Sequence, residues 1–136
     1  MGRSSLLTHA VGAVLGASAV VPSVLLVRRR TANTTALAGA GLVIAAAIYP
    51  AARTDRLAGP AGARELAGLV AAGLLATAAA GAGGTRGRRL IAAGWASHAL
   101  FDAAHDTGRG SSIPAWYPAA CAAFDLVLAS ELWRAD

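Results

Sequence analysis

The sequence is divided into long runs without a charged residue, and these runs constrain the fold more than any other feature. No Asp, Glu, Lys or Arg occurs between Arg3 and Arg28, and a second such run lies between Arg30 and Arg53. An α-helix needs about 20 mainly apolar residues to cross the hydrocarbon core of a bilayer. Each run is therefore long enough to form a membrane span.

The composition favours a membrane over an aqueous setting. Only 14% of the residues are charged and 56% are hydrophobic, whereas an ordinary soluble domain has about 25% charged residues. The net charge is +5, but nucleic-acid binding needs a basic face on a folded domain, and here arginines separate apolar runs. We therefore expect membrane lipid and a lipophilic small molecule as partners, and no nucleic acid. All twelve basic residues are arginines and none is lysine. This preference is typical of coding sequences rich in GC codons and favours a bacterial source.

Five helical spans are expected within a single domain, residues 1–136. The Gly-rich stretch at 81–84 suits a helix C-terminus, and Pro114 after two serines suits a helix start. The expected spans cover residues 6–27, 33–52, 65–83, 89–106 and 114–133. The predicted fold class is an all-α integral membrane bundle of about five short transmembrane helices.

The first span has a competing interpretation. Residues 17–19 have the small side chains of a signal-peptidase site, but the apolar run continues to Arg28, which favours a retained span. Gly12 and Gly16 are four residues apart on this span, a spacing that lets membrane helices approach closely. A homo-oligomer is one expected state of the protein.

Successive ends of the five spans alternate between two faces of the membrane. Face A receives the N-terminus and the loops at 51–64 and 106–113, and face B receives the other three ends. Seven arginines fall on face B and five on face A, so the positive-inside rule favours a cytoplasmic face B. We expect a multi-pass protein of the inner (plasma) membrane.

Polar residues form one stripe on the fourth span. Trp95, His98, Asp102 and His105 follow one another at steps of three, four and three residues, which places them on one face of a helix. A rise of 1.5 Å per residue puts His98 about 10 Å deeper than His105. The stripe is therefore expected to lead from face A toward the middle of the bilayer.

The fifth span carries a matching acid. Tyr117, Cys121 and Asp125 share a face, and a short loop makes this span antiparallel to the fourth, which puts Asp125 near the depth of His98 or Asp102. A charge at that depth costs about 2.5–3.5 kcal/mol on insertion scales, and such residues usually mark a functional site. The structural alternative is a His98–Asp125 pair that locks two helices together, but such pairs gain only about 0.6 kcal/mol.

Two chemistries fit these residues. In an acid–base site, one buried carboxyl group stays protonated and donates while a second carboxylate or an imidazole accepts. In a metal site, the same groups ligate a divalent cation such as zinc or iron. A single ion does not easily reach both histidines, which lie two turns apart. The candidate catalytic and metal-ligating residues are His98, Asp102, His105 and Asp125.

Aromatic side chains and the single cysteine surround this stripe. The candidate substrate contacts are Tyr49, Trp95, Trp116, Tyr117 and Cys121. For Trp116 and Tyr117 the alternative is an aromatic belt at the membrane interface, and for Cys121 it is a small buried hydrophobic residue.

Four arginines are expected around the face A opening: Arg53, Arg56, Arg64 and Arg109. Guanidinium groups bind phosphate well, so a phospholipid or prenyl diphosphate head group is one candidate occupant. The alternative is that these are ordinary solvated loop arginines.

The last third of the chain resembles small bacterial multispan membrane proteins that share an H-x3-D-x2-H helix followed by a W-Y-x3-C-x3-D helix. The motif residues here are His98, Asp102 and His105, and Trp116, Tyr117, Cys121 and Asp125. The resemblance implies that these residues occur together. It implies no particular reaction.

The leading hypothesis is a small membrane enzyme that acts on an isoprenoid or another lipid by acid–base isomerisation, cyclisation or hydrolysis. One alternative is a proton- or cation-coupled small transporter or channel subunit, which requires a second polar route opening on face B. Another is a membrane scaffold or assembly factor whose polar helices bind a partner span.

Overall fold

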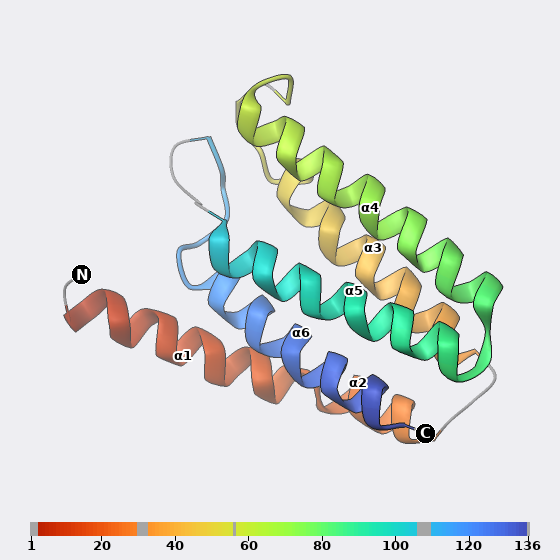
Figure 1. Ribbon diagram of the computed structural model, residues 1–136. Coiled ribbons are helices and arrows are strands. Elements are labelled where there is room, and N and C mark those ends of the chain that lie inside the picture. Colours follow the sequence, from red (N-terminus) through yellow and green to blue (C-terminus); the bar gives the residue numbers. More distant parts are fainter. Residues whose placement is uncertain (1–2, 30–32, 56, 106–109, 136) are drawn as a thin grey trace.

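In the part of the chain that the structure describes, six α-helices run roughly alongside one another, and α1 and α2 follow each other as one bent rod (Figure 1). The computed structural model describes residues 3–29, 33–55, 57–105 and 110–135. The helices are α1 (Arg3–Ala19), α2 (Val21–Arg28), α3 (Thr34–Ala51), α4 (Pro60–Ala82), α5 (Gly84–Ala104) and α6 (Tyr117–Arg134).

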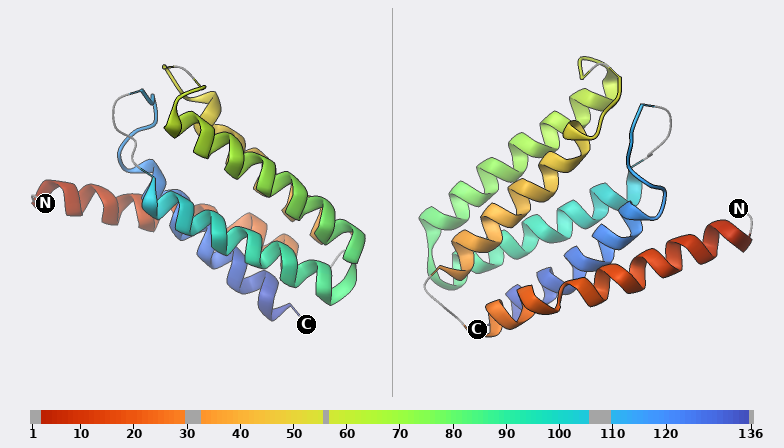
Figure 2. Two further views of the ribbon diagram at one scale, coloured as in Figure 1. Left: turned by 45° about the horizontal axis from the view of Figure 1, so that its top comes forward. Right: turned by 180° about the vertical axis from the view of Figure 1, so that it is seen from behind.

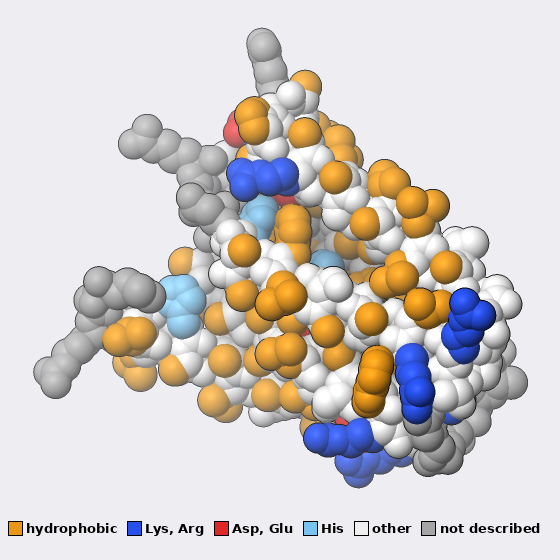
Figure 3. Space-filling view, in the orientation of Figure 1, with side chains coloured by type: hydrophobic (Ala, Val, Ile, Leu, Met, Phe, Trp, Pro, Cys, Tyr) orange, Lys and Arg blue, Asp and Glu red, His pale blue; other side chains and the backbone are white. Residues whose placement is uncertain are grey.

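Three helical segments are long and apolar enough to cross a membrane: Ser5–Arg28, Thr34–Ala51 and Pro60–Ala82. The other two helices, α5 and α6, are 21 and 18 residues long, and the charged residues that they carry lower their mean hydropathy. Large aliphatic side chains are exposed over the helix faces, and arginines gather at the end of the bundle near the C-terminus (Figure 3). The expected all-helical membrane bundle is confirmed.

The first expected span, 6–27, is not one uninterrupted helix. Pro22 lies in the first turn of α2, where its missing N–H is tolerated. A proline ring clashes with the carbonyl group four residues before it inside a helix, so α1 ends at Ala19 and the chain resumes at Val21. The expected span is present as Ser5–Arg28, and Pro22 divides it into two successive helices.

Prolines and glycines also move the other boundaries. The third span starts at Pro60 instead of residue 65, because proline suits the first position of a helix. Gly83 and Gly84 have positive φ angles of 60° and 49°, which make a tight turn into α5 and start that helix five residues before the expected 89. The last helix starts at Tyr117 instead of 114, with Pro118 in its first turn.

Packing proceeds from one side of the bundle to the other in the order α1, α6, α5, α4 and α3, and α3 also reaches α5 (Figure 2). Gly12 and Gly16 lie against the backbone of α6, where the Trp116 and Ala120 carbonyl groups occupy the space that a Cβ atom would need. The expected close approach at this glycine pair is present. At the opposite end of α6, Glu131 accepts two hydrogen bonds from Arg28.

The two loops at face A are joined to each other. The Thr54 amide donates to the Gly110 carbonyl group at 2.9 Å, and the Ser112 amide donates to the Ala52 carbonyl group at 3.0 Å. These bonds tie the connection between α3 and α4 to the connection between α5 and α6. They close the bundle around the end from which the polar stripe descends.

Candidate functional site

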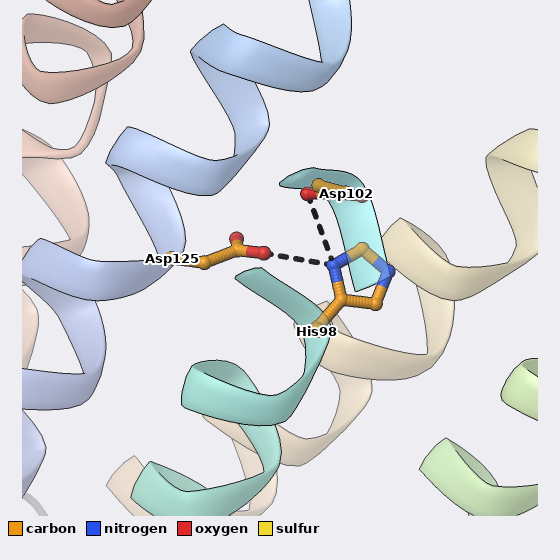
Figure 4. Close-up of side chains that lie close together, drawn as sticks. All are labelled: His98, Asp102 and Asp125. Atoms are coloured by element: carbon orange, nitrogen blue, oxygen red, sulfur yellow. Dashed lines mark hydrogen bonds and ion pairs between the residues drawn. The ribbon is translucent and has the colours of Figure 1, made fainter. Parts of the chain in front are cut away.

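Two neighbouring helices bring three ionisable side chains together inside the bundle. His98 and Asp102 are one turn apart on the buried face of α5, and Asp125 projects from α6 toward them (Figure 4). Their exposed fractions are 9%, 1% and 1%. The expected juxtaposition of these three residues is present, and we call them the reaction cluster.

One nitrogen of the imidazole faces both carboxylates. The His98 Nδ1 atom lies 2.7 Å from Asp125 Oδ2 and 3.4 Å from Asp102 Oδ2. With Asp125 ionised, Nδ1 carries the proton and donates to it, because a carboxylate only accepts hydrogen bonds. The neutral imidazole then has its lone pair on Nε2, which points away from both acids toward α3 and α4 (Figure 4).

Several polar atoms of the cluster are buried without a hydrogen-bond partner. Among the described residues these include His98 Nε2 and both Asp102 carboxylate oxygens. A buried polar atom without a partner costs about 1–3 kcal/mol, and such atoms call for a functional explanation. The cluster is therefore costly to the fold, as a binding or catalytic site commonly is.

The same side chains fit a divalent metal ion. Each residue of the cluster offers one ligand atom, and these three atoms lie within 4.8 Å of one another; the residues are His98, Asp102 and Asp125. A doubly charged cation would balance the two carboxylates, which removes the cost of burying a net charge. This set has three ligands instead of the four expected, because His105 lies elsewhere.

His105 is not part of the reaction cluster and lies just beyond the C-terminal end of α5 at Ala104. Its backbone is extended, with φ −76° and ψ 123°. Its ring lies against Tyr49, with centroids 4.1 Å apart, and its Nε2 atom is 3.4 Å from Glu65 Oε1.

Glu65 and Arg53 form a second polar group beside His105. The Arg53 Nε atom donates to Glu65 Oε2 at 2.7 Å, and its NH1 group donates to Asp55 at 2.7 Å. Hydrogen bonding to Glu65 raises the pKa of Arg53. Glu65 is only 2% exposed. We call Arg53, Glu65, His105 and the neighbouring Tyr49 the face A cluster.

Glu65 is not among the site residues expected from the sequence. A glutamate at the edge of an otherwise uncharged run was the available signal. The expected third span starts at this residue, whereas α4 begins at Pro60 and therefore places Glu65 in its second turn, buried within the bundle.

Two apolar cavities lie on opposite sides of the reaction cluster. The α3/α4/α5 cavity has a volume of about 300 Å³, and its wall includes Leu42, Ala72, Phe101, Glu65 and His98. The α2/α3/α6 cavity has a volume of about 330 Å³, and its wall includes Asp125. His98 therefore borders the α3/α4/α5 cavity, and Asp125, whose carboxylate contacts the His98 ring, borders the α2/α3/α6 cavity.

The expected substrate contacts are divided between these places. Trp95, Tyr117 and Cys121 line the α2/α3/α6 cavity, and the Trp95 indole also donates to the Ala38 carbonyl group at 3.1 Å. Tyr49 is buried in the face A cluster.

The remaining candidates lie at the margin of the bundle. Trp116 is 40% exposed, and its ring contacts Tyr117. Of the four face A arginines, Arg56 and Arg109 lie outside the described residues.

Compared with models of protein families, with curated proteins and with solved structures, the chain has no significant match.

Proposed function

We propose that this chain is a small membrane enzyme that performs acid–base chemistry on a lipophilic substrate, an isoprenoid or another lipid. The observation that carries the proposal is His98, whose Nδ1 atom is held by Asp125 at 2.7 Å while its Nε2 atom has no partner. A carboxylate that fixes one ring nitrogen sets the tautomer and leaves the other nitrogen to act as a base.

The imidazole of His98 supplies the proton transfer. Its Nε2 atom accepts a proton from the substrate, and the negative charge of Asp125 stabilises the imidazolium that forms. Returning that proton to another atom of the same molecule gives an isomerisation or cyclisation, which balances without a second reactant. Hydrolysis would require one water in addition.

The α3/α4/α5 cavity is the proposed substrate site because His98 lies in its wall. Its lining is otherwise mainly apolar, and enzyme pockets are typically apolar clefts with a few well-placed polar groups. We place the protein as a multi-pass protein in a bacterial plasma membrane, where such substrates are dissolved.

Transport across the membrane is less well supported than catalysis. A through-route for protons or cations needs polar groups on both sides of the cluster. Among the described residues, no buried titratable side chain lies between the reaction cluster and face B; Ile91 and Leu132 are fully buried on that side. The polar groups continue only toward face A, which suits a site with one entrance.

The lipid content of a host that expresses the protein tests this proposal. Extracts from cells with the wild-type chain should contain a lipid that is altered relative to cells with His98→Gln, because glutamine cannot take up a proton. His9→Gln is a matched control, since His9 bonds only to a carbonyl group of its own helix among its described contacts. Identical lipid profiles from cells with the wild type, His98→Gln and His9→Gln would contradict the proposal.

A metal-dependent version is the second candidate, favoured by the two Asp102 oxygens that lack partners. Zinc or iron held by His98, Asp102 and Asp125 would supply Lewis-acid chemistry at the same cavity. Metal analysis of the purified protein separates the versions. The acid–base version predicts no stoichiometric metal, and a stoichiometric metal that disappears in His98→Ala would replace it with the metal version.

A further inference from the structure

A furrow follows the seam between α4 and α5 from face A toward the reaction cluster. At face A it begins in a cavity of about 200 Å³, lined by Ala61, Arg64, Phe101, Ala104 and His105. We call this the mouth cavity. It shares Phe101 with the α3/α4/α5 cavity, so the two follow one another. Histidine side chains are visible in this furrow, with an arginine at its face A end (Figure 3).

Arg64 gives the mouth cavity a positive charge that no described residue neutralises. Arg53, the neighbouring arginine, is bound to both Glu65 and Asp55. Arg64 has no hydrogen bond or ion pair within the described part of the chain, and it lines the mouth. Its guanidinium group is therefore available to a ligand, and it binds phosphate oxygens in a fork-like geometry.

His105 provides a second, independent polar group. Its side chain is 8% exposed and lines the mouth cavity. Its Nε2 atom lies 3.4 Å from Glu65 without the geometry of a hydrogen bond, so it is a buried polar atom without a partner. A neutral imidazole can still present one N–H group to an anion.

The first turn of α4 adds donors at the same place. Gly59 precedes this helix and has no side chain with which to cap it, and Ala61 of the first turn lines the mouth. The free N–H groups and the positive end of a helix dipole favour an anion there. Glu65 does not cancel this preference because Arg53 already compensates its charge, and Asp55 is half-exposed beyond Arg53.

Below the mouth the furrow becomes apolar. The α3/α4/α5 cavity is lined by α4 residues as far as Leu75, eleven residues beyond Arg64, which corresponds to about 16 Å of helix. Leu42, Ala46 and Ala72 form part of its wall. A ligand that fits the whole furrow has a compact anionic head and a hydrocarbon chain.

We propose that the α4/α5 furrow binds an amphiphile with a phosphate-type head group, held at Arg64 and His105, whose hydrocarbon chain extends into the α3/α4/α5 cavity beside His98. This inference rests on the proposed function in so far as it names the substrate class of that site. His98 lies seven residues from His105, about 10 Å along the helix. The reacting bond is therefore in the chain of the lipid and not in its head group.

Binding of dodecyl phosphate tests the proposal without relying on catalysis. The full chain is held in micelles of a non-ionic sugar detergent and titrated by calorimetry, with protein-free micelles as background. Arg64→Gln should weaken binding by about 10- to 100-fold, since a hydrogen-bonded charge contributes that much affinity. Arg86→Gln removes an exposed arginine at the opposite end of the bundle and should leave binding unchanged. Dodecanol should bind weakly, and equally to the wild type and Arg64→Gln.

Further measurements distinguish a lipid head group from free phosphate, and distinguish the furrow proposal from the proposed function. If inorganic phosphate binds as tightly as dodecyl phosphate, the hydrocarbon chain of the ligand contributes nothing to affinity. That result would overturn the proposal that the ligand is an amphiphile. Equal affinity of the wild type and Arg64→Gln for dodecyl phosphate would overturn the head-group site. His98→Gln should bind dodecyl phosphate as the wild type does. Binding of dodecyl phosphate by the wild type without any lipid conversion by the wild type would reject the proposed function and keep the furrow.

Discussion

Asp125→Asn is expected to slow the lipid conversion roughly 10²- to 10⁴-fold, the usual contribution of acid–base catalysis, while the bundle stays folded. The amide has the shape of the carboxylate but no charge to stabilise the imidazolium of His98. Its NH2 group can also turn toward Nδ1 and select the wrong tautomer. An amide costs less to bury in a bilayer than a carboxylate, so thermal stability should not fall. The rate is measured in proteoliposomes on the lipid that the extracts identify.

Glu131→Gln is the matched control for this prediction. Glu131 is on the same helix, but it pairs with Arg28 at face B, away from the reaction cluster. Its replacement should leave the conversion rate unchanged. Full activity of Asp125→Asn would remove Asp125 from the mechanism. Loss of activity with an equal loss of folded protein would make its role structural.

Ala72→Phe is expected to reduce the conversion by at least about 10²-fold without altering any polar group. Ala72 is 7% exposed and lines the α3/α4/α5 cavity, so an aromatic ring there occupies the space proposed for the lipid chain. Displacing a reacting group by about 1 Å can cost about 10²-fold in rate. Overpacking should change the free energy of unfolding by no more than about 1–3 kcal/mol. Activity and thermal unfolding are measured on the same preparation.

Two alanine replacements complete this test. Ala67→Phe places the same ring on an exposed part of α4, and Ala45→Phe places it in the α2/α3/α6 cavity. Both should keep the conversion rate. If Ala45→Phe is inactive and Ala72→Phe is active, the lipid lies on the Asp125 side of the cluster and the assignment of the cavity is wrong.

The positions of the helices could be predicted because charge-free runs have a direct physical meaning in a bilayer. The exact ends of the helices depend on individual prolines and glycines, which the hydrophobic pattern does not reveal. Pro22 interrupts the first span, Pro60 starts α4 five residues early, and Gly83 and Gly84 shorten the turn before α5. Each of these is a local backbone effect that proline and glycine announce in the sequence.

The reaction cluster could be predicted in part. The spacing of His98 and Asp102 sets a shared helical face, and a short connection to the next helix brings Asp125 to the same depth. His105 was expected in the same group, but the helix ends one residue before it. Its contact with Glu65 depends on how α4 packs against α5, and no local pattern fixes that packing. The two cavities likewise depend on the placement of several helices at once.

Transfer of label from water to lipid is the most direct test of the claim that His98, Asp102 and Asp125 form a reaction centre. Proteoliposomes containing host lipid are incubated in water enriched in deuterium and heavy oxygen, and the recovered lipids are examined by mass spectrometry. An isomerisation or cyclisation places solvent hydrogen on carbon when the proton held by His98 exchanges, and hydrolysis places solvent oxygen in the product. The wild-type protein should label a lipid that His98→Gln leaves unlabelled. Lipids that remain unlabelled with the wild-type protein, or that are labelled equally by both, would contradict a reaction centre at this cluster.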